Sequence, residues 1–167
     1  MTSTYRRLGL IVAAIVTLID QAIKYMVAVP LALRTRVDGI ELLPIFNLRW
    51  IENRGVSMGF FHADTELARW ALVAMTAGIA VLVAVWLWRE RSRDDAIALG
   101  LILGGAFGNI IDRVRLGYVI DYADFHIGDI RPFLVFNLAD AAITIGVLIL
   151  LARALMLREK APKSETP

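Results

Sequence analysis

The segment WALVAMTAGIAVLVAVWLW (Trp70–Trp88) holds 19 consecutive residues without a charge. A helix of that length rises about 28 Å, which is enough to cross the hydrocarbon core of a bilayer. Three more apolar stretches occur in the chain. The sequence therefore predicts an all-α integral membrane protein, one membrane domain over residues 1–167, with four transmembrane helices at about 8–29, 67–88, 96–116 and 132–155.

The composition agrees with a membrane protein and excludes several kinds of site. Hydrophobic residues make up 58% of the chain, and the mean hydropathy is +0.64, whereas a soluble domain is about half apolar. The absence of cysteine excludes disulfides, a thiol nucleophile and cysteine-based metal sites. No HExxH pattern predicts zinc, so we expect no metal or cofactor. The basic residues form no stripe, so we expect no nucleic-acid partner.

The first apolar stretch has two interpretations. Arg6 and Arg7 before an apolar run are typical of a cleaved signal peptide. However, the run continues past Asp20 to a length that spans a bilayer, and no clear small-x-small site ends it. A retained transmembrane helix is therefore favoured.

The distribution of Lys and Arg predicts the orientation. Residues 1–7, 89–95 and 153–167 hold nine basic residues in 29 positions, against eight in the 59 positions of 30–69 and 113–131. Short segments that are dense in Lys and Arg tend to remain in the cytoplasm. Both termini should therefore be cytoplasmic, and the polar residues of the helices should gather near the outer face.

The outer loop, residues 30–66, is expected to contain short strands. The segment IFNLRWI (Ile45–Ile51) alternates apolar and polar residues from Phe46 onward, as a half-buried strand does. We expect a small extracytoplasmic β-sheet at the membrane surface, with Trp50, Phe60 and Phe61 suited to the interface. The alternative is a disordered connector. The tail, residues 158–167, is expected to be flexible.

Polar residues within the apolar stretches are costly in hydrocarbon and usually face a protein interior. Asn137 and Asp140 share one helix face, as do Asn109 and Arg113. Gly105 would let another helix come close. An alternative is that the asparagines only join helices and that Arg113 neutralises an aspartate.

Several acids could work together at the outer face. Asp20 and Lys24 are spaced to form an ion pair within their own helix. Asp112, Asp121 and Asp124 could each partner Asp140, and spacing alone does not choose among them. Asp112 lies off the Asn109/Arg113 face, which favours one of the two later acids.

Two adjacent carboxyl groups share a proton, so the pair could activate a water molecule and hydrolyse an amide. Ser57 has no nearby histidine in the sequence, and His62 and His126 each stand alone, so no rival nucleophile is evident.

Five segments, in order, resemble the motifs of the lipoprotein signal peptidase (signal peptidase II) family of bacterial aspartic proteases. The segments are DQ (Asp20–Gln21, with Lys24 following), NRGVSMGF (Asn53–Phe60), GGAFGNIIDR (Gly104–Arg113), VIDYADF (Val119–Phe125) and FNLADAAI (Phe136–Ile143). In the second motif, Ser57 and Met58 stand where a small residue and an aromatic residue are more usual.

The resemblance implies a catalytic dyad of Asp121 and Asp140. The positions that it implies to bind substrate or support the site are Asn53, Gly105, Asn109, Arg113, Asn137, Asp20, Gln21 and Lys24. Asp124 matches a position of uncertain role.

The resemblance also implies an activity and a location. The expected enzyme is an endopeptidase that cleaves diacylglyceryl-modified prolipoproteins before the lipidated cysteine, using water activated by the dyad. It would be a monomer in the bacterial inner membrane, with its site near the periplasmic face. Membrane lipids and cyclic peptide antibiotics of the globomycin type are the other expected partners.

Two other classes fit a small polytopic protein. A proton-coupled transporter or channel subunit would use intramembrane acids, but the inner half of the helices is nearly bare of polar groups. A structural four-helix subunit would use its polar residues only to lock helices together, and it should tolerate aspartate-to-asparagine changes.

Overall fold

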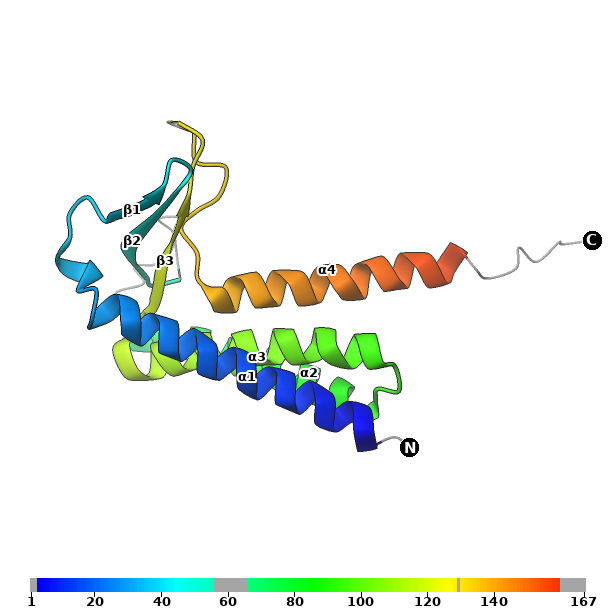
Figure 1. Ribbon diagram of the computed structural model, residues 1–167. Helices are drawn as coiled ribbons and strands as arrows, with labels where there is room; N and C mark the ends of the chain where they lie inside the picture. Colours follow the sequence, from blue (N-terminus) through cyan, green and yellow to red (C-terminus); the bar gives the residue numbers. More distant parts are fainter. Residues whose placement is uncertain (1–2, 56–65, 129, 160–167) are drawn as a thin grey trace, which may run out of the picture.

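The computed structural model describes residues 3–55, 66–128 and 130–159. Within these ranges four helices are long and apolar enough to span a membrane: α1 (Ser3–Ala28), α2 (Glu66–Arg89), α3 (Arg93–Leu116) and α4 (Leu138–Glu159). The apolar window of α3 is 61% buried, whereas those of α1, α2 and α4 are 22%, 17% and 17% buried. The other three helices therefore surround α3 (Figure 1).

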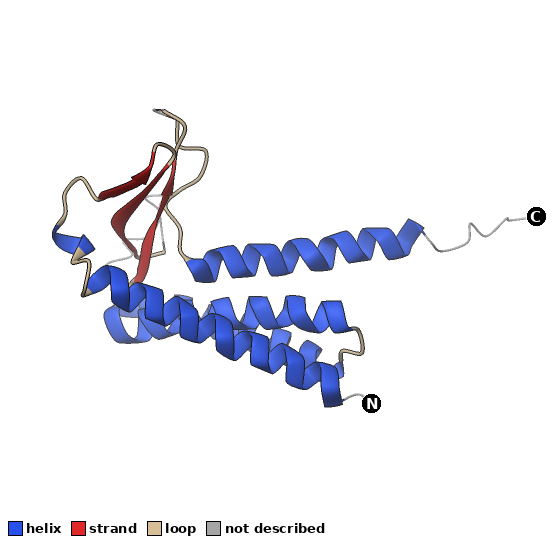
Figure 2. Cartoon of the chain, viewed as in Figure 1, coloured by secondary structure: helices blue, strands red, loops and turns tan. Residues whose placement is uncertain are grey.

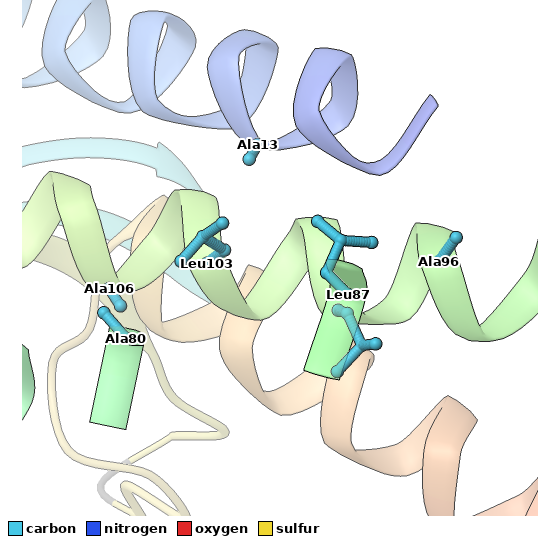
Figure 3. Close-up of a cluster of buried hydrophobic side chains, with 7 residues drawn as sticks. Ala13, Ala80, Leu87, Ala96, Leu103 and Ala106 are labelled. Carbon is cyan, nitrogen blue, oxygen red and sulfur yellow. The ribbon is translucent and has the colours of Figure 1, made fainter. Parts of the chain in front are cut away.

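Small residues let the helices approach α3 closely. A Cβ atom at Gly104 would collide with the Ala13 backbone of α1, and one at Gly105 would collide with the Ala139 carbonyl of α4. Such small-residue contacts replace the hydrophobic driving force that is missing between helices in lipid. Figure 3 shows the apolar core of the bundle, which is formed by Ala13, Ala80, Leu87, Ala96, Leu99, Leu103 and Ala106.

The two ends of α3 are capped. The Ser92 hydroxyl accepts a hydrogen bond from the Asp95 amide at 3.4 Å, and acidic residues fill the first turn. At the other end Gly117 adopts a φ of 86°, and its amide donates to the Arg113 carbonyl at 3.1 Å. Glycine takes this left-handed conformation without steric cost, so the chain leaves the helix here and enters a strand.

A three-stranded antiparallel sheet lies at the end of the bundle where α1 ends and α4 begins (Figure 2). Its strands are β1 (Ile40–Leu43), β2 (Phe46–Asn53) and β3 (Val119–Phe125), in the order β1-β2-β3. The first residues of α1 and the last residues of α4 lie at the opposite end of the helices (Figure 1).

The strand expected at residues 45–51 is confirmed by β2, so a disordered connector is wrong for this part of the loop. The strand β3 was not predicted. Six of its seven residues are buried, so its sequence has no alternation of apolar and polar residues to reveal it. Phe60 and Phe61 lie outside the described residues, as does most of the tail.

The fourth helix begins at Leu138, and the predicted start at about 132 is wrong. Phe136 is instead paired with Ala123 of β3 through reciprocal backbone hydrogen bonds of 2.8 and 3.1 Å. The Asn137 side chain then accepts a hydrogen bond from the Asp140 amide at 3.0 Å, as a helix N-cap does. The first helix also starts earlier than predicted, at Ser3, and the fourth continues to Glu159.

Candidate active site

Asp121 and Asp140 are linked through one residue, Asn137. Asp121 lies on β3, Asp140 lies in the first turn of α4, and Asn137 is the fully buried N-cap of that helix. The Asn137 side-chain amide donates a hydrogen bond to Asp121 Oδ1. The Asn137 backbone amide donates to Asp140 Oδ2 at 3.3 Å. The strand and the helix N-terminus therefore bring the two carboxyl groups to a common position.

Two more asparagines complete the hydrogen bonding of the acids. Asn53 Nδ2, at the end of β2, donates to Asp121 Oδ2 at 2.9 Å. Asn109 Nδ2, on α3, donates to Asp140 Oδ1 at 2.8 Å. All four carboxyl oxygens thus accept a hydrogen bond, and both side chains are held in one orientation.

The environment of Asp121 favours its protonated form. The side chain is 2% exposed. Burial raises the pKa of the Asp121 carboxyl to about 6; the hydrogen bond from Asn53 opposes this shift, and the charge of Asp140 adds to it. Asp140 is less buried than Asp121. A carboxyl pair of this kind can carry a single proton near neutral pH, which is the condition for acid–base chemistry.

A buried ion triad lies directly behind the acids. Lys24 Nζ is 2.9 Å from Asp20 Oδ2 and 2.8 Å from Asp112 Oδ2, and all three side chains are at most 3% exposed. The ion pair predicted between Asp20 and Lys24 is confirmed. Lys24 also donates to Asn109 Oδ1 at 3.2 Å, which turns the Asn109 amide group toward Asp140.

Each carboxylate of the triad holds the backbone beside one of the site acids. Asp20 Oδ1 accepts from the amide of Ala139, which precedes Asp140, at 3.1 Å. Asp112 Oδ2 accepts from the amide of Ile120, which precedes Asp121, at 3.2 Å. The triad therefore fixes α1, β3 and α4 relative to one another.

Gln21 and two glycines complete this support. Gln21 Nε2 donates to Asp112 Oδ1 at 2.9 Å and to the Gly108 carbonyl at 3.2 Å. A Cβ atom at Gly108 would collide with the Asp20 carboxylate. Gly105 faces the first turn of α4, so both glycines allow α3 to lie close to the site.

Arg113 is half-buried at the end of α3. Its Nε is buried without a hydrogen-bond partner, and within the described ranges its guanidinium forms no ion pair shorter than 4.0 Å. Nevertheless, the charges of Asp140, Asp121 and Asp112 act on it. The interpretation of Arg113 as the direct ion-pair partner of an aspartate therefore finds no support in the part of the chain that is described.

The other two acids that could have partnered Asp140 lie elsewhere. Asp112 belongs to the ion triad. Asp124 is fully buried and pairs with Arg131 at 3.2 Å and with Arg49 at 3.6 Å. Because Asp124 is three positions from Asp121 along β3, the two side chains point to opposite faces of the sheet.

Two contributors were missed by the sequence analysis. Tyr122 Oη accepts a hydrogen bond from the Leu138 amide at 3.2 Å, and burial raises the pKa of its phenol to about 12, so it stays protonated. Arg69, at the start of α2, donates to the carbonyls of Arg113 and Val114 at 2.8 and 2.7 Å and closes the end of α3. Neither residue belongs to a periodic pattern that would mark such a role in advance.

His126 lies just beyond β3, whereas Ser57 and His62 lie outside the described residues. Across residues 3–55, 66–128 and 130–159, no group of three or more His, Cys, Asp or Glu side chains could hold a metal ion.

The chain is similar to known proteins over nearly its whole length. The family described as signal peptidase (SPase) II matches residues 12–156. A lipoprotein signal peptidase of Sphingopyxis alaskensis is 56% identical over 163 residues, covering 98% of this chain and 94% of that protein. One of Rhizorhabdus wittichii is 60% identical over 157 residues, covering 94% of this chain and 91% of that protein.

The fold is shared with solved structures. A bacterial membrane enzyme solved by the in meso method at 2.3 Å resolution superposes with a TM-score of 0.77, at 26% identity, over 95% of this chain and 94% of its own. Another bacterial membrane enzyme, solved by the same method at 1.9 Å resolution, gives a TM-score of 0.74 at 28% identity. The match covers 88% of this chain and 92% of that one.

Proposed function

The chain belongs to the signal peptidase II family, and from this premise we propose that Asp121 and Asp140 are its catalytic dyad. The enzyme is an aspartic endopeptidase that removes signal peptides from lipoprotein precursors. The observation that carries the assignment of the dyad is the double contact of Asn137, which donates one hydrogen bond to each carboxyl group.

The proposed reaction uses water and the dyad alone. One carboxyl group is ionised and takes a proton from a water molecule, and the resulting hydroxide attacks the carbonyl carbon of the scissile amide. The protonated partner donates its proton to the carbonyl oxygen. When the tetrahedral intermediate collapses, the carboxyl group that took the proton from water passes it to the leaving nitrogen, and the C–N bond breaks. The other carboxylate takes a proton back from a hydroxyl group of the intermediate as the carbonyl reforms, so the dyad returns to its single-proton state.

The surrounding polar residues have two proposed tasks. Asn53, Asn109 and Asn137 hold the carboxyl groups in place through the hydrogen bonds described above. The Arg113 guanidinium offers N–H donors to the substrate backbone. Donors aimed at the developing oxyanion stabilise the transition state more than the ground state, which would make Arg113 a direct contributor to the rate.

The residues behind the dyad keep its geometry. Asp20, Gln21 and Lys24 are proposed to act through the backbone of Ala139 and Ile120, without touching substrate. Gly105 is proposed to act by admitting the first turn of α4. A misplacement of about 1 Å can cost roughly a hundredfold in rate, so such support is functionally important.

The proposed substrate is a prolipoprotein whose cysteine already carries a diacylglyceryl group, and the proposed cut lies before that cysteine. The acyl chains would anchor the cysteine at the membrane surface. The sheet lies at one end of the helices (Figure 2). Asp121 on β3 and Asp140 in the first turn of α4 belong to that end, which is the level where such an anchored substrate would meet them. This one-sided clustering also favours an enzyme over a proton pathway, which needs polar groups through the whole membrane.

The proposed location is the bacterial inner membrane, with both termini in the cytoplasm and the site near the periplasmic face. The density of Lys and Arg supports this orientation. We further propose that residues 1–167 form a single membrane domain that acts as a monomer among membrane lipids. Cyclic peptide antibiotics of the globomycin type would bind at the dyad and compete with substrate.

The function is tested by cleavage of one precursor in its lipidated and unlipidated forms by the purified protein. We expect cleavage of the lipidated form only. Asp121→Asn and Asp140→Asn should each lower the rate by a factor on the order of a thousand or more. Asp124→Asn serves as a control. Asp124 is also a buried acid on β3, but its side chain points to the opposite face of the sheet from Asp121, so this variant should keep measurable activity. Near-normal processing by either dyad variant would refute the assignment.

A further inference from the structure

A cavity of about 350 Å³ lies beside Asp140. Its walls come from the segment that precedes α4 and from the first two turns of that helix. They include Phe133, Leu134, Phe136, Asp140, Ala141 and Thr144. The volume lies within the range of small-ligand sites in proteins.

The lining of the cavity suits hydrocarbon. Among the described residues that line it, only Asp140 and Thr144 have polar side chains. The Thr144 hydroxyl donates to the Asp140 carbonyl at 2.9 Å, and the Asp140 carboxyl oxygens accept from Asn109 and from the Asn137 amide. The polar atoms are therefore engaged elsewhere, and the surface offered to an occupant is carbon.

The cavity leads from the dyad into the apolar part of the molecule. Thr144 lies one helical turn beyond Asp140, about 6 Å farther along α4. This part of α4 belongs to the window of membrane-spanning hydropathy, Leu138–Met156. A group that starts at the scissile bond and enters this cavity must therefore run toward the hydrocarbon core.

The outer wall of the cavity is fixed at both ends. Arg131 is tied to the buried Asp124 carboxylate by contacts of 3.2 and 3.3 Å. Phe136 is tied to Ala123 by the backbone bridge. Between these anchors, Phe133 and Leu134 are 62% and 84% exposed. The Phe133 ring also lies against Phe125, with ring centroids 6.4 Å apart. The wall is therefore preformed, and the exposed parts of Phe133 and Leu134 offer apolar surface to an occupant.

We propose that this cavity holds one acyl chain of the diacylglyceryl group on the substrate cysteine; the proposal rests on the function given above. The acyl chain is attached to the residue next to the scissile bond, and one end of the cavity adjoins Asp140. The chain extends into hydrocarbon, and the other end of the cavity lies along the membrane-spanning part of α4. Occupation of the cavity would place the scissile carbonyl against Asp140 and would make cleavage depend on lipidation.

The test uses lipopeptides with one peptide sequence and paired octanoyl, lauroyl or palmitoyl chains. Thr144→Phe fills the cavity, and Thr144→Val removes only the hydroxyl group. The matched control is Ala14→Phe, which fills a second apolar groove, between α1 and α3 and away from the dyad. Leu134→Ala removes apolar surface from the outer wall at an exposed position outside any helix. This second variant tests the proposal if Thr144→Phe does not fold.

We expect Thr144→Phe to raise KM for the palmitoyl substrate roughly tenfold more than for the octanoyl substrate. Leu134→Ala should change KM in the same chain-dependent way, whereas Thr144→Val and Ala14→Phe should not. A penalty that is equal for all chain lengths would overturn the proposal. Failure of the wild-type protein to cleave any lipopeptide would instead refute the proposed function.

Discussion

Asp20 and Ala139 are joined by a hydrogen bond of 3.1 Å from the Ala139 amide to the Asp20 carboxylate, across 119 residues of sequence. This bond ties the first helix to the first turn of the last one. Since Asp140 follows Ala139, the position of a proposed catalytic acid depends on a carboxylate that has no direct part in the chemistry. Lys24 and Asp112 extend the same connection to β3.

Replacement of Lys24 by Met should be strongly destabilising. It leaves Asp20 and Asp112 buried without their cation, and removing one partner of a buried ion pair costs about 3–5 kcal/mol. Arg34→Met is a suitable control because Arg34 is mostly exposed in its pair with Glu52, and it should cost at most about 1 kcal/mol. Thermal unfolding in detergent measures both. Equal stability of the two variants would show that the triad does not hold the fold together.

Asn137→Ser should separate helix capping from the orientation of the dyad. Serine retains an oxygen that can accept from the Asp140 amide, as a good N-cap does, but it has no amide to donate to Asp121. We expect a folded protein whose kcat falls by a factor of about ten to a hundred, in line with the loss of one charge-assisted hydrogen bond. Asn47→Ser, on β2 and without a hydrogen bond to either acid, should keep normal kcat. A normal kcat for Asn137→Ser would mean that this bridge is dispensable.

The buried Asp121 should make stability depend on pH in an identifiable direction. Its pKa of about 6 in the folded protein lies above the ordinary value of 3.8, so the folded state binds the proton more tightly than the unfolded state. The free energy of unfolding should therefore fall as pH rises from about 4 to about 6, by on the order of 3 kcal/mol in total.

Asp121→Asn should remove this component, which is checked by comparing the pH dependence of Tm in the two proteins. The prediction fails if the wild-type protein and the variant lose stability in parallel across that interval.

Gly105→Ala should push α3 and α4 apart. The added methyl group would meet the Ala139 carbonyl and the Ile143 side chain, and overpacking of this kind typically costs about 1–3 kcal/mol. Gly78→Ala in α2 is the matched control, because a methyl group there has no neighbour within 4 Å among the described atoms. It should be neutral or stabilising by up to about 1 kcal/mol. Unfolding measurements should rank the two variants in this order, and the reverse order would contradict the close approach.

Features that depend on local sequence could be predicted well. The uncharged run from Trp70 to Trp88 is sufficient to indicate a transmembrane helix, because hydrophobic length is a local property. The alternation after Phe46 reveals β2, and the four-residue spacing of Asp20 and Lys24 reveals their ion pair.

Features that depend on distant contacts could not be predicted from local patterns. The start of α4 is set by the pairing of Phe136 with Ala123, which no helix periodicity in the segment records. Spacing alone also left Asp112, Asp121 and Asp124 open as partners for Asp140. The arrangement of α3 and β3 places Asp112 against Lys24 and Asp124 against Arg131, and no local pattern in the sequence reveals these two contacts.

The central position of α3 has a consequence for how the protein is made. It has the lowest mean hydropathy of the four helices, 1.5, and it carries Asn109, Asp112 and Arg113. Lipid alone is a poor solvent for such a helix, so its polar groups are satisfied only once Lys24 of α1 and Asp140 of α4 are beside it. Because α4 follows α3 in the chain, the polar groups of α3 remain incompletely paired until α4 has inserted beside it.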